Sequence, residues 1–155
     1  MLIRKTPLRR TPWVRRNRIQ ASRRRRAGGP TKTVVTVVLA RSCRDGRPCC
    51  EVCGQPLSGE RGYDWSLHHR RGRDGSAGEH DAANLLAVCG GSNVDRCHGR
   101  IHAGRPAAET NGWSISRNSA ADPLTVALVV DNGKRRVLFT ADGGYLEQPP
   151  PMLPA

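Results

Sequence analysis

The feature that most constrains the fold is a Cys-x-x-Cys pair, Cys50 and Cys53, followed directly by Gly54. Two thiols separated by two residues can face one centre when a tight turn joins them, and a glycine permits the close backbone of such a turn. A second pair, Cys89 and Cys97, follows further along the chain. Because four thiolates in two such groups are typical of a structural zinc site, the sequence predicts that these cysteines hold Zn²⁺.

A metal staple is expected because the chain is small and poor in apolar residues. Its 155 residues can form one modest domain with extensions. Only 37% of them are hydrophobic and 4% aromatic, so burial alone would leave the core marginal. The remaining cysteines, Cys43 and Cys49, are ambiguous, since either could replace Cys50 as a ligand or both could be plain thiols.

The positive charge is concentrated at the start of the chain. The net charge is +13, and residues 1–30 contain eleven Lys and Arg and no acidic residue. This segment lacks a hydrophobic period and ends in Gly-Gly-Pro, so we expect a basic disordered tail and a polyanionic partner. The run Arg23-Arg24-Arg25-Arg26 fits a solvated segment and equally a phosphate-binding arm that orders on nucleic acid.

An export signal is the competing interpretation of this basic start, because the apolar residues 34–40 follow it. Lys32 interrupts the run upstream, Arg41 follows it at once, and the run is short for a signal core. No stretch approaches the length of a membrane span. We therefore expect a cytoplasmic protein without membrane contact, whose reduced cysteines serve as metal ligands.

The pattern of elements predicts an α+β domain. Folding is expected to begin near Thr31, and residues 32–42 suit a short helix, although their valines favour a strand on propensity alone. Residues 43–57 are expected to be a turn-rich knuckle, and residues 94–103 a helix that ends at Gly104 and Pro106. Strands are expected at residues 63–67, 112–116, 124–130 and 135–140, with a hairpin turn at Asn132-Gly133, and residues 84–88 form a brief apolar run.

Four of the five histidines form two close pairs, His68-His69 and His98-x-x-x-His102. A spacing of four on a helix places both imidazoles on one face, where they can reach a single cation. Adjacent residues on a strand point to opposite sides, so His68 and His69 are expected to have different roles. Either pair alone is more typical of an ordinary surface, and the combination favours a metal site. His80 is expected on the loop surface.

The order of these motifs resembles the HNH endonuclease family, particularly its small phage-encoded members. The resemblance covers about residues 36–105 and rests on the cysteine knuckle, Leu67-His68-His69-Arg70, Asn84-Leu85-Leu86, Cys89 and Cys97-His98-Gly99-Arg100-Ile101-His102. It implies a ββα-metal (His-Me finger) core, in which two short strands and a helix hold one divalent ion. Seven residues separate Cys89 from Cys97 where many members have two, and His68 stands where many have Asp.

The resemblance also implies roles for individual residues. His69 would be the general base, Asn84 would hold its imidazole, and His68, His98 and His102 would bind Mg²⁺, Mn²⁺, Ni²⁺ or Zn²⁺. The cation would neutralise charge on the scissile phosphate and the leaving 3′ oxygen, giving 5′-phosphate and 3′-hydroxyl products. Nucleic-acid contacts are expected from Arg70, Arg71, Arg73 and Arg100.

The sequence thus predicts a basic tail (residues 1–30), a zinc-stapled HNH core (31–105), a C-terminal β-hairpin extension (106–147) and a Pro-rich tail (148–155). The leading hypothesis is an enzyme that hydrolyses DNA. The phage relatives imply phage DNA processing or packaging in the host cytosol, with packaging proteins as further partners. The alternatives are a non-catalytic zinc module that binds nucleic acid and a phage structural component that has lost activity.

Overall fold

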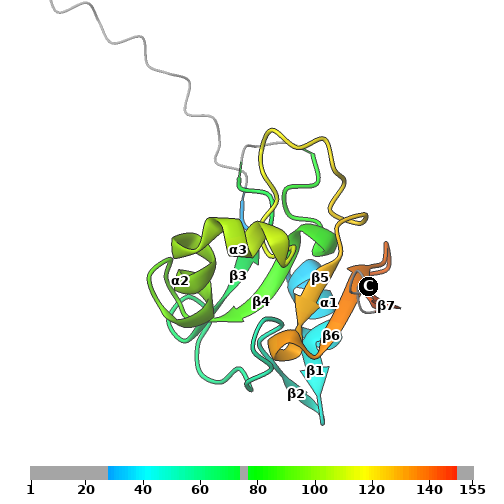
Figure 1. Cartoon of the computed structure of the whole chain (residues 1–155). Helices are drawn as coiled ribbons and strands as arrows, with labels where there is room; N and C mark the ends of the chain where they lie inside the picture. Colours follow the sequence, from blue (N-terminus) through cyan, green and yellow to red (C-terminus); the bar gives the residue numbers. More distant parts are fainter. Residues whose placement is uncertain (1–27, 74–76, 150–155) are drawn as a thin grey trace, which may run out of the picture.

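The computed structural model of the chain describes residues 28–73 and 77–149 (Figure 1). The predicted basic tail lies outside the described residues as far as residue 27, and the predicted Pro-rich tail does so from residue 150. The architecture is α+β, with short helices and small antiparallel sheets. In chain order the elements are α1 (Lys32–Ser42), β1 (Cys43–Arg44), β2 (Arg47–Pro48), β3 (Trp65–His69), η1 (Ala82–Asn84), β4 (Leu85–Cys89), α2 (Arg96–Ala103), α3 (Arg105–Thr110), β5 (Leu128–Val130), η2 (Asp131–Gly133), β6 (Arg135–Phe139) and β7 (Tyr145–Gln148).

Helix α1 forms despite its run of valines. The Thr31 hydroxyl caps it by accepting a hydrogen bond from the backbone N–H of Val34 at 3.3 Å, which supports the predicted start. Val38 is fully buried and packs with Leu85 and Ala87 of β4. This packing outweighs the preference of the valines for a strand, so the predicted short helix is confirmed.

Strands β3 and β4 form the antiparallel hairpin that carries the first histidine pair. The register places His68 opposite Leu86 and His69 opposite Leu85. Strand β3 begins later than predicted and includes both histidines. Strand β4 is buried along its whole length, and its alternate residues enter two cores: Leu85 and Ala87 face α1, whereas Leu86 and Val88 face the rest of the domain.

Helix α2 carries the second histidine pair and packs against β4. It begins at Arg96 rather than at the predicted residue 94, and Gly104 ends it as expected. Pro106 does not act as a stop, because it lies in the first turn of α3, where a missing N–H costs nothing. A Cβ at Gly99 would lie 2.4 Å from the carbonyl carbon of Val94, so the loop before α2 needs a glycine there.

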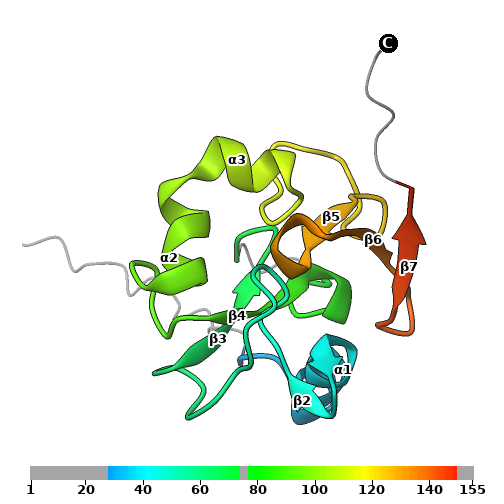
Figure 2. The ribbon, with the colours of Figure 1, turned by 60° about the horizontal axis from the view of Figure 1, so that its bottom comes forward.

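Strands β5, β6 and β7 form a separate three-stranded antiparallel sheet (Figure 2). The predicted hairpin around Asn132-Gly133 is confirmed, although its turn is longer than two residues, with Val130 opposite Arg135. The strand predicted over residues 112–116 is absent; within the described chain only an isolated bridge between Arg71 and Ile115 occurs there. Strand β7 was not predicted.

The C-terminal sheet shares its core with the histidine-bearing hairpin. Leu128, Val137 and Phe139 belong to the same buried cluster as Leu86 of β4 and Ile101 of α2. The C-terminal extension therefore packs against the strand and the helix that lie next to the histidines. Among the described helices, none is long and apolar enough to cross a membrane.

Candidate functional site

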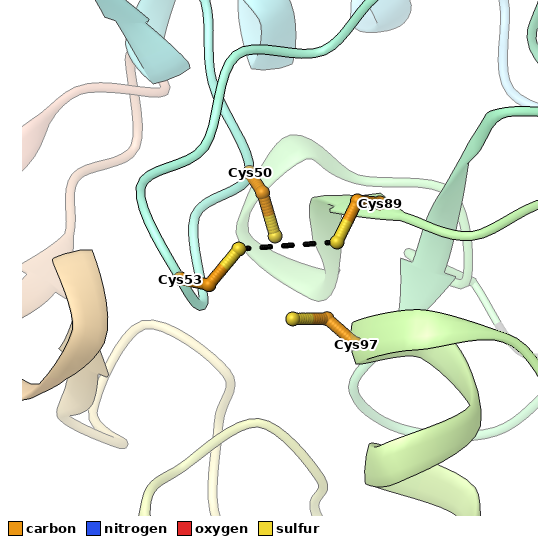
Figure 3. Close-up of side chains that lie close together, drawn as sticks. All are labelled: Cys50, Cys53, Cys89 and Cys97. Atoms are coloured by element: carbon orange, nitrogen blue, oxygen red, sulfur yellow. Dashed lines mark hydrogen bonds between the residues drawn. The ribbon is translucent and has the colours of Figure 1, made fainter.

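The four predicted zinc ligands lie together although they come from three parts of the chain. Cys50 and Cys53 stand in the turn after β2, Cys89 ends β4 and Cys97 lies in the first turn of α2. Their side chains converge on a common centre (Figure 3). All four sulfur atoms lie within 4.8 Å of one another. The predicted grouping is confirmed, and the cluster can hold a structural metal such as zinc.

The geometry of this cluster fits tetrahedral thiolate coordination. A Zn–S bond of about 2.3 Å implies sulfur atoms about 3.8 Å apart. Cys53 Sγ lies 3.8 Å from Cys89 Sγ, far beyond the length of a disulfide. Gly54, with φ of +76°, closes the turn by donating its N–H to the Cys50 carbonyl at 2.8 Å. A hydrogen bond from Cys97 lowers the pKa of Cys50 to about 5, whereas burial raises the pKa of Cys53 to about 11 and the hydrogen bond with Cys50 raises that of Cys97.

The two cysteines that the sequence left ambiguous lie outside this cluster. Cys49 is buried, and its Sγ lies 3.4 Å from the Arg47 carbonyl oxygen. Cys43 begins β1 and is half-buried. Cys50 therefore belongs to the quartet, and neither of the other two replaces it.

A second group of potential ligands consists of His68 from β3 and His98 and His102 from α2. One ring nitrogen from each lies within 4.8 Å of the others. The ring centroids form a nearly equilateral triangle with sides of 5.4, 5.2 and 5.0 Å. His68 and His98 are buried and His102 is exposed, so the group opens to solvent on one side. The strand and the helix thus bring together three side chains that the sequence placed in two separate motifs.

Hydrogen bonds determine which nitrogen of each buried ring stays available. His68 Nε2 lies 3.1 Å from the Trp113 carbonyl, which can only accept, so this nitrogen carries the proton and Nδ1 is free. The Ser66 hydroxyl donates to the Gly90 carbonyl at 2.7 Å and so accepts from His98 Nδ1 at 2.7 Å. His98 Nε2 is then free. Such outer hydrogen bonds are what metal-binding histidines typically have.

The protonation of these rings also suits metal binding. Burial, with the charges of His98 and His102, lowers the pKa of His68 to about 3. Burial and the His102 charge likewise lower the pKa of His98. Both rings are therefore neutral at pH 7 and keep a lone pair for a cation. The three imidazoles fit a divalent transition-metal ion by donor type and by spacing.

His69 faces the other way, as strand alternation predicted. Its Nε2 lies 3.0 Å from Nδ1 of His80, and Nε2 of His80 lies 3.6 Å from the Glu79 carboxylate. Burial and the charges of Arg73 and His80 lower the pKa of His69 to about 4.

His80 is not the surface residue that the sequence suggested. Its side chain is only 20% exposed and is held between His69 and Glu79. The available sign was a histidine flanked by two acids, Glu79 and Asp81, shortly before Asn84. That pattern alone does not reveal contact with His69, because the contact depends on how the intervening loop returns to the strand.

Asn84 is buried beside the histidines but does not hold the imidazole directly. Its Nδ2 donates to the carbonyls of Glu79 at 2.9 Å and Arg71 at 3.2 Å, and its Oδ1 accepts from the Arg71 N–H at 2.7 Å. Among the described residues its side-chain hydrogen bonds therefore go to backbone atoms, not to His69. Asn84 fixes both ends of the loop between β3 and η1, which carries His80.

Two of the four arginines that were predicted to contact nucleic acid, Arg70 and Arg71, donate their hydrogen bonds to the protein backbone instead. Arg70 is 1% exposed, and its guanidinium donates to four backbone carbonyls, those of Gly112, Ala83, Pro123 and Val126. Burial, with the charge of Arg41, lowers the pKa of Arg70 to about 9, which leaves it protonated at pH 7. Arg70 cannot clamp a phosphate, because the carbonyls that it binds, three of them in the C-terminal extension, enclose its guanidinium.

The remaining arginines differ in how accessible they are. Arg71 donates to the carbonyls of Ser119 and Ala121 and is also committed to the fold. The Arg73 side chain is 61% exposed and lies 4.0 Å from Glu79. Arg100 is exposed on α2, with its guanidinium 5.5 Å from the centre of the Trp113 ring. Arg73 and Arg100 are thus the two predicted contacts that a ligand can still reach.

Comparisons with known proteins add no family to this description. No family model, no curated protein and no solved structure matches the chain. Any function is therefore inferred from the residues of the chain and from their geometry.

Proposed function

We propose that the chain is a metal-dependent nuclease of the HNH type that hydrolyses DNA phosphodiester bonds. The observation that carries this proposal is the division of labour between two adjacent residues of β3. His68 joins a triangle of three imidazoles, whereas His69 is a neutral imidazole held by a separate hydrogen bond. A hydrolase that pairs a metal with a general base needs both arrangements side by side.

His68, His98 and His102 would hold the divalent ion. The free nitrogens, Nδ1 of His68 and Nε2 of His98, follow from the hydrogen bonds to Trp113 and Ser66. Three imidazoles and no carboxylate favour Zn²⁺ or Ni²⁺ over Mg²⁺. When bound there, such an ion would supply Lewis-acid chemistry towards the phosphate and its leaving oxygen.

His69 would act as the general base. Its ring is neutral at pH 7 and can accept a proton from the attacking water. Because Nε2 is engaged by His80, the nitrogen that accepts this proton is Nδ1. In-line attack would form the bond from the water oxygen to phosphorus while the P–O3′ bond breaks; the 3′ oxygen would take a proton from solvent, which leaves a 5′-phosphate and a 3′-hydroxyl.

The cysteine cluster would keep the two ligand-bearing elements in place. It joins the end of β4, through Cys89, to the first turn of α2, through Cys97. The next residue on α2 is His98. A structural Zn²⁺ at the cluster would therefore set the position of the helix that supplies two of the three imidazoles.

Contacts to the DNA backbone would come from exposed basic groups. Arg73 is accessible beside Glu79 and His69, and Arg100 is accessible on α2, the helix that carries His98 and His102. Residues 1–30 add eleven further positive charges. Contacts of this kind bind phosphate without reading sequence, so the proposal carries no target specificity.

The test is cleavage of supercoiled plasmid by the purified full chain with Zn²⁺, Ni²⁺, Mn²⁺ or Mg²⁺, beside His69→Ala. We expect wild type to convert plasmid to nicked or linear DNA. We expect His69→Ala to lose at least a hundredfold in rate, since a general base contributes about 10²–10⁴. His69→Ala should still bind DNA and metal. Equal cleavage by the two proteins would overturn the assigned base. Binding by both without cleavage under any metal would support the non-catalytic module instead.

A further inference from the structure

Glu79, His80 and His69, the proposed base, form an array in which the His80 ring lies between the other two side chains. His69 Nε2 and His80 Nδ1 are 3.0 Å apart. On the far side of the same ring, His80 Nε2 lies 3.6 Å from Glu79 Oε1, and this buried nitrogen has no hydrogen-bond partner among the described residues. The Glu79 side chain is 7% exposed.

One possible ligand atom from each of these three residues lies within 4.8 Å of the others, so they could also be read as metal ligands, but the order of their atoms argues against a chelate. In a chelate all ligand atoms face one centre. Here His69 approaches one nitrogen of His80 and the Glu79 carboxylate approaches the other. A ring with His69 at hydrogen-bond distance from one nitrogen and the Glu79 carboxylate at ion-pair distance from the other is instead the middle member of an array.

The array favours one placement of the protons. The negative charge of Glu79, 3.6 Å from Nε2 of His80, favours a proton on that nitrogen. Nδ1 of His80 then has the lone pair and accepts from His69 Nε2. His69 is thereby held as the Nε2–H tautomer, with Nδ1 open.

The backbone that carries this array is fixed by hydrogen bonds. Asn84 Nδ2 donates to the Glu79 carbonyl at 2.9 Å, and the N–H of Asp81 donates to the Gly78 carbonyl at 3.0 Å. The N–H of Asn84 closes the following turn on the Asp81 carbonyl at 2.9 Å. His80 is therefore anchored on both sides, which a residue that orients another side chain requires.

We propose that His80, backed by Glu79, is a positioning residue that locks the His69 ring and its tautomer so that Nδ1 faces the attacking water. This inference rests on the proposed function only for the role of that water. The hydrogen bond between His69 and His80 and the contact of His80 with Glu79 do not depend on activity.

The first test reads the tautomer without any substrate. In the zinc-loaded full chain, labelled with ¹⁵N-histidine and measured at pH 8, His69 should show a protonated Nε2 and an unprotonated Nδ1. His80→Ala should shift His69 to a mixture of tautomers. Glu79→Gln should lower the population of the Nε2–H tautomer of His69. Asp81→Asn, which alters an exposed acid on the same loop, should leave the spectrum unchanged.

The second test separates positioning from folding. Asn places an oxygen acceptor near the position of His Nδ1, so His80→Asn should retain most activity, while His80→Ala should lower kcat about tenfold to a hundredfold with little change in KM. A His69 tautomer unchanged in His80→Ala would overturn the inference. So would a loss of one bound metal in that variant, because it would show a chelate. If wild type cleaves no DNA, the proposed function fails, and the tautomer spectra still decide the role of His80.

Discussion

Ser66 and His98 are joined by a 2.7 Å hydrogen bond in which the hydroxyl accepts from His98 Nδ1. The same hydroxyl donates to the Gly90 carbonyl at 2.7 Å, so its acceptor role towards the ring is fixed. A residue of β3 therefore determines which nitrogen a residue of α2 presents to the His68–His98–His102 triangle.

Ser66→Ala should weaken metal binding at the histidine triangle and leave the cysteine cluster intact. Without the acceptor, His98 can adopt the other tautomer, and loss of such an outer hydrogen bond costs about 10–100-fold in metal affinity. Calorimetric titration with Zn²⁺ or Ni²⁺ should show this loss at one site while one tightly held zinc remains. Ser92→Ala, an exposed loop serine, is the control. Unchanged affinity in Ser66→Ala would contradict the tautomer assignment.

Cys53→Ser should abolish the bound structural metal and most of the folded state. The cluster joins three segments that a small core cannot hold alone, and structural zinc sites supply folding free energy directly. Metal analysis and circular dichroism should show no retained zinc and a large fall in Tm. Cys49→Ser should keep its zinc, because Cys49 lies outside the quartet. A folded, zinc-free Cys53→Ser protein would refute the structural role.

Gly99→Ala should lower the unfolding free energy, because it disturbs the packing of the preceding loop against α2. The added Cβ would lie 2.4 Å from a backbone carbon of Val94, which cannot move like the end of a side chain. Overpacking of this kind costs about 1–3 kcal/mol of unfolding free energy. Gly29→Ala, with nothing within 4 Å of the new Cβ, is the matched control. Denaturant unfolding of the two variants should differ accordingly, and equal midpoints would contradict the tight packing.

Deletion of residues 1–26 tests the basic segment that precedes the described fold. It removes eleven positive charges. If this segment contacts phosphates, DNA affinity should fall and its dependence on salt should become flatter, because fewer counterions are released on binding. Filter binding or fluorescence anisotropy across a salt series measures both quantities. An unchanged slope would assign the salt dependence to the folded part of the chain.

The parts of the site that could be predicted are those encoded by local spacing. The Cys50–Cys53 turn follows from two intervening residues and Gly54, and the shared face of His98 and His102 follows from the helical repeat. Strand alternation likewise predicted that His68 and His69 would face different partners. These features depend on neighbours in sequence, which the sequence displays.

The parts that could not be predicted depend on contacts between distant segments. Helix α1 is stabilised by packing against β4, which its valine-rich sequence does not reveal. His80 reaches His69 only because the loop folds back on the strand, and Asn84 acts on that loop instead of on the ring. Arg70 looked like a phosphate contact because its burial is set by the C-terminal extension, whose carbonyls it binds.

Substitution of Arg70 should therefore lower the unfolding free energy, whereas substitution of Arg73 should lower DNA affinity. Arg70→Ala leaves one buried and three partly buried hydrogen bonds without their donor, and an unsatisfied buried group costs about 1–3 kcal/mol, so the unfolding free energy should fall by on the order of 3 kcal/mol. Arg70→Lys should rescue little, because one ammonium cannot replace a planar fork that spans these acceptors.

Arg73→Ala should behave in the opposite way. Its side chain is 61% exposed and only 4.0 Å from Glu79, so its removal should change stability by less than about 0.5 kcal/mol. If Arg73 contacts phosphate, DNA affinity should fall for all sequences alike, with a salt slope smaller by about one. Chemical denaturation and anisotropy on the same two proteins measure both effects. A stable Arg70→Ala protein with weakened DNA binding would reverse the assignment, because it would make Arg70 the phosphate contact.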